Sequence, residues 1–126
     1  MGGVFELFVK SHFSAAHAIE GYAGDCARIH GHNWMIEVYA RCKRLDALGM
    51  GVDFRLIERS IEDLLDDLDH CNLNELPDFK GLNPTSENIA RFIYKGLSGK
   101  LNDEDVKISR VKVGETPGAG AFYWEE

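Results

Sequence analysis

The chain has few cysteines, a deficit of basic residues and no long apolar run, and each shortage argues against a class of protein. Three cysteines in 126 residues cannot all pair within one chain, so we interpret them as reduced thiols of a cytoplasmic protein. No apolar stretch approaches the roughly 20 residues that a membrane helix requires. The first apolar stretch carries Glu6, Lys10 and His12, so we expect no secretory signal peptide.

The charge balance argues against a broad nucleic-acid-binding face. The chain has 14 Lys and Arg against 21 Asp and Glu, a net charge of −7. A nucleic-acid-binding face neutralises phosphates with basic side chains, whereas a small anionic substrate needs only a few local ones. With 44% hydrophobic and 28% charged residues, we expect one soluble globular domain over residues 1–126.

Alternating apolar and polar residues predict strands at both ends of the chain. Residues 4–13 and 32–42 alternate in this way, and the even-numbered positions of the second segment are expected to face the core. A third strand is predicted over residues 106–115, with a bulge between Ile108 and Val111 because the apolar parity shifts there. The final AFYWEE segment predicts a short last strand.

Two amphipathic helices are predicted between these strands. Residues 54–69 carry apolar side chains at helical spacing, and Asp53 precedes them as a fair N-cap. The second helix begins in PTSENIARFIYKGL, with Thr85 or Ser86 as its cap. The order ββααββ predicts an α+β domain with an antiparallel sheet.

Two histidines lie close together in the sequence CARIHGH. Side chains two positions apart on a strand face the same side, so His30 and His32 could share one ion. His17, in FSAAH, becomes a third if the first two strands pair as neighbours. Three histidines are typical of a catalytic zinc that keeps one coordination position open. The alternative is a set of solvent-facing or core histidines, since a His-x-His motif alone is weakly specific.

Three further residues carry chemistry that the sequence leaves open. Histidine titrates near neutral pH, so Asp69 and His70 could transfer protons, although adjacent side chains on a helix do not face each other. The alternative for His70 is a helix C-terminal histidine favoured by the dipole. A carboxylate on an apolar strand face needs donors, so Glu115 could bind a guanidine-like ligand group, or lie exposed at the strand end.

Six motifs in one order resemble the 6-pyruvoyl-tetrahydropterin synthase family. They are FSAAH, CARIHGHNW, GMGVDF, LDHCNLN, NPTSENIA and VGETPGAGAFYW, and they run from about Phe5 to Tyr123. The chain looks most similar to the bacterial branch, the 6-carboxy-tetrahydropterin synthases of queuosine biosynthesis. Cys26 and the spacing Cys-x3-His-x-His suit that branch, whereas the folate branch has a glutamate at this position. GMGVDF departs from the family, because it has a glycine where the family more often has an apolar residue.

The resemblance implies a fold and an assembly. The fold is the tunnelling fold, a four-stranded antiparallel sheet with two helices on one face. Such subunits close into trimers by strand pairing, and two trimers stack into a homohexamer, which covers the exposed sheet edges. Active sites in the family lie between subunits.

The resemblance also implies roles for individual residues. The ligands of a Zn²⁺ cofactor would be His17, His30 and His32. The proton-transfer groups would be Cys26, Asp69 and His70. The residues that bind the pterin would be Glu115, which anchors the ring, with Thr85 and Ser86 lining its pocket.

The implied substrate is 7,8-dihydroneopterin triphosphate, and the implied products are 6-carboxy-5,6,7,8-tetrahydropterin, acetaldehyde and triphosphate. Zinc would lower the pKa of the substrate's side-chain hydroxyls, and a thiol and an imidazole would remove and return protons. A substrate that chelates the metal needs open positions, so we expect Cys26 to be a reagent and not a ligand. Arg28 and Lys10 are the candidates for binding the triphosphate.

Three alternatives stay open. The first is the sister activity, elimination of triphosphate to a 6-pyruvoyl product. The second is a zinc hydrolase or hydratase, which would need neither Cys26 nor a pterin anchor. The third is a structural-zinc module with Cys26 as fourth ligand, whose fold would melt on chelation.

Overall fold

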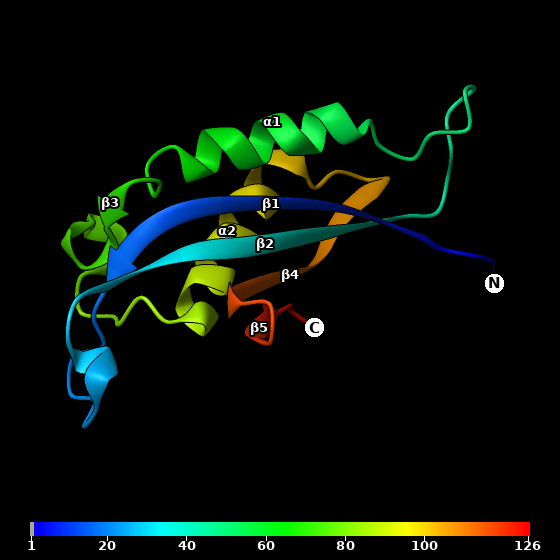
Figure 1. Ribbon diagram of the computed structural model, residues 1–126. Coiled ribbons are helices and arrows are strands. Elements are labelled where there is room, and N and C mark those ends of the chain that lie inside the picture. Colours follow the sequence, from blue (N-terminus) through cyan, green and yellow to red (C-terminus); the bar gives the residue numbers. More distant parts are fainter. Residues whose placement is uncertain (1) are drawn as a thin grey trace.

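The computed structural model describes residues 2–126 as one five-stranded sheet with two helices (Figure 1). The strands are β1 (Phe5–His17), β2 (His30–Cys42), β3 (Cys71–Asn72), β4 (Val106–Thr116) and β5 (Ala119–Tyr123). Their order in the sheet is β3-β1-β2-β4-β5. The pairs β1–β2, β2–β4 and β4–β5 are antiparallel, whereas β3 joins β1 in parallel.

The predicted four-stranded, purely antiparallel sheet is therefore corrected to a mixed sheet of five strands. The additional strand, β3, pairs through two residues only, with Ala15 and Ala16 of β1. A strand of two residues is too short to show alternation in the sequence, and its position between the helices breaks the expected ββααββ order.

The long hairpin of β1 and β2 confirms the expected parity. Its register runs from Phe5 opposite Cys42 to His17 opposite His30. The buried residues of β2 are Trp34, Ile36, Val38, Ala40 and Cys42, all at even positions. β1 continues to His17, four residues beyond the predicted end, because pairing with β2 extends through a run of small residues that carries no clear alternation.

The helices begin where the caps predict. α1 (Phe54–Leu65) is capped by Asp53, whose carboxylate accepts from the Arg55 N–H at 2.9 Å. α2 (Ser86–Leu101) is capped by Thr85, whose hydroxyl accepts from the Asn88 N–H at 3.2 Å. α1 ends four residues before the predicted boundary. The turn that follows still buries Leu68, and this accounts for the longer apolar pattern in the sequence.

Both helices pack on one face of the sheet, and their apolar residues form a single core with the inward residues of β1, β2 and β4. The predicted bulge is confirmed, because the pairing of β2 with β4 skips Ser109 between Ile108 and Arg110. Three short 3₁₀ helices complete the chain: η1 (Asp25–Ala27), η2 (Leu73–Glu75) and η3 (Pro77–Phe79). No helix in residues 2–126 has the length and hydropathy to cross a membrane.

Gly51, in the GMGVDF motif, occupies a tight space. A Cβ atom added to Gly51 would lie 2.2 Å from the Sγ of Cys42, which is buried at the end of β2. A larger residue at position 51 therefore requires the Cys42 thiol to move or disappear.

Two loops extend from opposite ends of the hairpin (Figure 1). Residues 18–29 project beyond the end of β1 where His17 lies, and residues 43–53 leave the other end, near the N-terminus. The sequence motifs that carry chemistry gather at the first of these ends.

Candidate active site

The pairing of β1 with β2 brings three histidines together. His17 lies opposite His30, and His32 follows on the same face of β2. The ring centroids are 4.6 Å apart for His17 and His30, 5.2 Å for His17 and His32, and 4.8 Å for His30 and His32. One nitrogen of each ring lies within 4.8 Å of the others, so the three side chains could hold one metal ion.

Backbone carbonyls determine which ring nitrogens are free. The Nδ1 atoms of His17 and His30 lie 2.7 Å from the carbonyl oxygens of Pro84 and Arg28, respectively. A carbonyl only accepts, so each Nδ1 carries the proton and, in the neutral ring, each Nε2 offers a lone pair. This arrangement is typical of metal-binding histidines, which donate their second N–H to an outer partner.

Two ring nitrogens of the histidine cluster have no hydrogen-bond partner in the part of the chain that the structure describes. The Nε2 atoms of His17 and His32 are buried and unsatisfied within the described chain. Buried polar atoms without a partner are rare and need an explanation. A zinc ion held by three imidazoles fits this donor set, since zinc takes neutral histidine nitrogens and leaves a fourth position for water or substrate.

His17 is held in the form that binds a metal. Burial lowers the pKa of its imidazole, and the neighbouring His30 and His32 lower it further. The hydrogen bond to Pro84 and the charge of Glu115 oppose this decrease without reversing it. A neutral ring at neutral pH is ready to bind a cation without first losing a proton.

Glu115 of β4 lies beside this cluster. Its carboxylate oxygens are 3.6 Å from Nε2 of His32 and 3.9 Å from Nε2 of His17. The same side chain borders a cavity of about 200 Å³ at the N-terminus of α2. The residues that line this cavity are Ser86, Glu87, Glu115, Ala119, Gly120 and Ala121. Glu115 therefore separates the imidazole cluster from a space that could hold a polar ring.

The two predicted pocket residues on α2 differ in position. Ser86 lines the cavity, whereas the Thr85 hydroxyl caps the helix and Thr85 is not among the lining residues. Glu87 also lines the cavity, and the sequence motifs do not predict it as a site residue. Its only signal was its place in NPTSENIA, next to the two residues that were assigned.

Cys26 lies in η1, within the loop of residues 18–29, and is half-buried. The described side chains that could share one ion with the histidines do not include it. Its backbone carbonyl accepts a hydrogen bond from the N–H of Ile19 at 2.8 Å, which closes the loop upon itself.

Asp69 and His70 contact each other, contrary to the expectation for adjacent helical residues. Oδ2 of Asp69 lies 2.9 Å from Nδ1 of His70. The reason is that α1 has already ended at Leu65 and that His70 has a left-handed backbone, with φ of 58°. Because α1 ends at Leu65, His70 does not lie in the last turn of the helix, and the helix dipole does not account for it.

This pair is attached to the edge of β1. The N–H of Ser14 donates to Oδ1 of Asp69 at 2.8 Å, and this bond, with His70 adding to it, lowers the pKa of the carboxyl. The His70 side chain is 81% exposed. A left-handed backbone at a non-glycine residue costs energy, and such residues cluster at active sites and ligand-binding sites.

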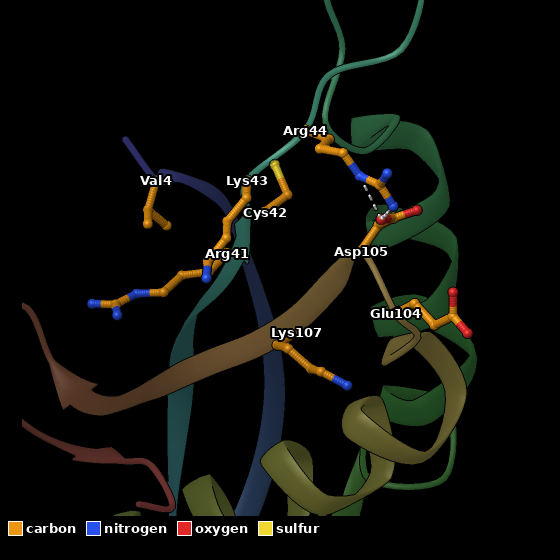
Figure 2. Close-up of a pocket in the computed structure, with 8 residues that line it drawn as sticks. All are labelled: Val4, Arg41, Cys42, Lys43, Arg44, Glu104, Asp105 and Lys107. Carbon is orange, nitrogen blue, oxygen red and sulfur yellow. Dashed lines mark hydrogen bonds and ion pairs between the residues drawn. The ribbon is translucent and has the colours of Figure 1, made fainter. Parts of the chain in front are cut away.

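A larger cavity, of about 510 Å³, lies at the opposite end of the hairpin (Figure 2). Its lining includes Arg41, Lys43, Arg44 and Lys107. Figure 2 shows Arg44 turned toward Asp105, with which it pairs, and Arg41 extending away from that pair. This basic cavity is separated from the histidines by the whole length of β2, roughly 40 Å.

The two candidates for binding triphosphate also differ in position. Lys10 occupies an even position of β1 and is exposed on the sheet face opposite to that of His17. Arg28 is exposed and lies two residues before His30, whose ring it holds through its carbonyl. Within one chain, Arg28 is therefore the candidate near the histidines.

Comparison with known proteins gives matches over nearly the whole chain. The profile of the family described as 6-pyruvoyl tetrahydropterin synthase matches residues 6–126. The chain is 34% identical to a 6-carboxy-5,6,7,8-tetrahydropterin synthase of Synechocystis sp., over 94% of this chain and 92% of that protein. It is 35% identical to a 6-pyruvoyl tetrahydrobiopterin synthase of Dictyostelium discoideum, over 79% and 73%.

A solved structure has the same fold. The 6-pyruvoyl tetrahydropterin synthase of Caenorhabditis elegans superposes with a TM-score of 0.87 at 27% identity, over 99% of this chain and 98% of that one. The chain therefore belongs to the 6-pyruvoyl tetrahydropterin synthase family.

Proposed function

We propose that the protein is a zinc-dependent carbon–carbon lyase of queuosine biosynthesis. It converts 7,8-dihydroneopterin triphosphate to 6-carboxy-5,6,7,8-tetrahydropterin, acetaldehyde and triphosphate. The observation that carries this proposal is the pair of buried Nε2 atoms of His17 and His32, which lie beside the Glu115 carboxylate and have no hydrogen-bond partner within residues 2–126. Family membership, the Cys-x3-His-x-His spacing and the relative in Synechocystis sp. support this choice of reaction.

The metal centre consists of His17, His30 and His32. Zinc at this position supplies Lewis-acid polarisation of the substrate's side-chain oxygens. The carbonyls of Pro84 and Arg28 keep two of the imidazoles in the orientation and tautomer that bind a cation.

The pterin ring binds in the cavity beside the metal centre. Glu115 accepts N–H donors of the ring, and Ser86 at the start of α2 borders the same space. Thr85 contributes by capping α2 and so fixing Ser86 in place. With the ring held by Glu115, the substrate's side chain extends toward the histidines, which is the orientation the reaction needs.

Proton transfer is assigned to Cys26, Asp69 and His70. The Cys26 side chain, as its thiolate, takes up a proton from the substrate's side chain and becomes the thiol, and His70 serves as the second acid or base with its ring oriented by the Asp69 carboxylate. Arg28 binds the triphosphate end.

The working assembly is a homohexamer of stacked trimers with sites between subunits. Among the residues that the structure describes, 5–14 of β1 have a strand partner on one side only, because β3 covers no more than Ala15 and Ala16. An open edge of this length is ready to pair with another subunit. His70, exposed at the same edge, would reach a neighbouring subunit's site.

The second candidate function is the sister reaction, which releases triphosphate and leaves a 6-pyruvoyl side chain. The relative in Dictyostelium discoideum favours it, since its identity to this chain is similar. Incubation of the zinc-loaded protein with 7,8-dihydroneopterin triphosphate, followed by mass spectrometry, separates the two. Acetaldehyde with 6-carboxy-tetrahydropterin is the expected result. A 6-pyruvoyl product assigns the sister activity, and unchanged substrate refutes both.

A further inference from the structure

Two asparagine side chains hold the chain directly after His17. Asn74 accepts a hydrogen bond from the N–H of Ala18 at 2.8 Å and donates one to the carbonyl of Ala18 at 2.9 Å. Asn83 makes the same pair of bonds with the backbone of Glu20, at 2.8 and 3.0 Å. Each amide thus uses its acceptor and a donor on one residue, as a neighbouring strand would.

Ile19, which lies between Ala18 and Glu20, holds the backbone of Cys26. The N–H of Ile19 donates to the carbonyl of Cys26 at 2.8 Å, while both its neighbours are fixed by the asparagines. The other backbone hydrogen bonds within the loop are local turns, such as those that Ala27 and Arg28 make three residues back. The position of Cys26 relative to His17 therefore depends on residues 18–20.

The two asparagines are themselves attached to rigid parts of the fold. Asn74 belongs to η2, next to the fully buried Leu73, and its N–H donates to the side chain of Asn72 at 3.1 Å. The carbonyl of Asn83 accepts from the side chain of Asn88 in α2 at 2.8 Å. The loop is thus tied to both the segment after α1 and the start of α2.

We propose that Asn74 and Asn83 are positioning residues that fix the Cys26 loop against the metal centre. This role rests on the proposed function, since it assumes that Cys26 acts on the substrate. It gives a physical reason for the asparagines in the motifs LDHCNLN and NPTSENIA, which have no assigned role. Loss of the hydrogen bonds of either asparagine displaces the Cys26 thiol without removing it, so turnover falls while the zinc ligands stay in place.

The test compares Asn74→Asp and Asn83→Asp with Asn102→Asp in the zinc-loaded, full-length protein. The Asp variants keep the shape and the acceptor but lose the donor to the carbonyls of Ala18 or Glu20. Asn102, at the other end of the sheet, uses only its acceptor oxygen, for the N–H of Ile108 at 2.7 Å, and is the matched control. Asn74→Ala and Asn83→Ala, which remove both bonds, form a second pair.

Three quantities are measured: zinc per chain, the rate at which iodoacetamide alkylates Cys26, and kcat and KM. We expect zinc to stay at one per chain in all variants. The alkylation rate should change in the variants at Asn74 and Asn83 but not in Asn102→Asp. In the same variants at Asn74 and Asn83, kcat should fall by about tenfold with a smaller change in KM. The proposal is overturned if the variants at Asn74 and Asn83 have the same alkylation rate and the same kcat as Asn102→Asp. If the wild-type protein makes no pterin product, the proposed function is refuted. The alkylation rate of Cys26 does not depend on turnover, so it still tests whether the two asparagines position the loop.

Discussion

The carboxylate of Glu115 lies within 4 Å of two imidazole nitrogens, 3.6 Å from that of His32 and 3.9 Å from that of His17. These distances are too long for hydrogen bonds, so the contact is electrostatic. The same carboxylate borders the cavity at the N-terminus of α2. One side chain therefore connects the part of the site that can hold a metal with the part that can hold a ring.

Glu115→Gln tests the ring-binding role. The amide keeps the shape of the side chain but loses the negative charge and one acceptor, and bonds to charged groups are about twice as strong as neutral ones. We expect pterin affinity to fall by about tenfold or more while zinc remains at one per chain at saturating metal. Isothermal titration with a pterin measures the first quantity and metal analysis the second. Glu37→Gln, on the opposite sheet face, is the control, and an unchanged pterin affinity in Glu115→Gln removes Glu115 from the binding site.

His30→Ala and His32→Ala test the metal centre. Each variant removes one of three nitrogens that lie within 4.8 Å of one another, so stoichiometric zinc and turnover should be lost together. His12→Ala is the matched control, because His12 is exposed on the other face of β1. Metal content after dialysis is the measurement. Full zinc occupancy in both single variants would falsify the ligand assignment.

Much of this site could be predicted from the sequence because it depends on strand periodicity. Alternation along β2 puts His30 and His32 on one face, and a hairpin register places His17 opposite His30. The core of β2 and both helix caps follow from equally local patterns. The strand parity and the caps need only short-range rules, whereas the place of His17 was expected only if the first two strands pair as neighbours, as they do.

Other features depend on contacts that no local pattern encodes. The contact between Asp69 and His70 requires a left-handed residue that is not glycine, and β3 is formed by two residues after it. The approach of Glu115 to His32 depends on the order of the strands in the sheet, which places β4 beside β2. The bonds of Asn74 and Asn83 join residues more than 50 positions apart. Each of these is a tertiary relation that periodicity cannot predict.

Burial of His17 predicts a pH dependence of stability in the metal-free protein. Its pKa in the folded state lies below the ordinary value of about 6.5, so the unfolded chain takes up a proton at a higher pH than the folded chain does. The free energy of unfolding should therefore decrease as the pH falls from 7.5 through 6.5 toward 5.5. Asp69, whose pKa is also lowered, loses its contribution only at more acidic pH.

Urea unfolding at these three pH values measures the effect. His17→Asn removes the titrating group but keeps a donor for the carbonyl of Pro84, so the decrease should be smaller in this variant. The wild-type slope, if retained in His17→Asn, would assign the pH dependence to other groups.

The contact between Gly51 and Cys42 predicts a coupled pair of substitutions. Gly51→Ala places a Cβ 2.2 Å from the Cys42 sulfur, and overpacking of this kind typically costs about 1–3 kcal/mol. Cys42→Ala removes the sulfur, so the double variant should lose less stability than the sum of the two single variants. Urea denaturation gives all four free energies of unfolding. Gly99→Ala, where an added Cβ meets nothing within 4 Å, is the control and should not destabilise. Additive single effects would show that the Cβ at position 51 and the Cys42 sulfur do not interact, and would contradict this prediction.

Cys26→Ala decides between the two roles that its spacing to the histidines allows. The side chains that could share an ion are histidines only, and Cys26 lies in the loop that projects beyond them. A thiolate ligand would occupy a position that the substrate needs and would add negative charge to the metal, whereas a thiolate that does not bind the metal can serve as a base. Cys26→Ala should therefore keep zinc near one per chain and keep the fold, yet lose about 100-fold or more in kcat.

Metal analysis, urea unfolding and steady-state kinetics on Cys26→Ala measure the three quantities, with Cys42→Ala as the control for loss of a thiol in the core. A structural zinc closed by Cys26 gives a different pattern, in which Cys26→Ala loses its zinc and part of its stability together. Normal turnover with full zinc would remove Cys26 from the reaction. Retained zinc with lost turnover is the only one of these results that makes Cys26 a reagent, because it separates the thiol's contribution to the chemistry from any contribution to the metal site.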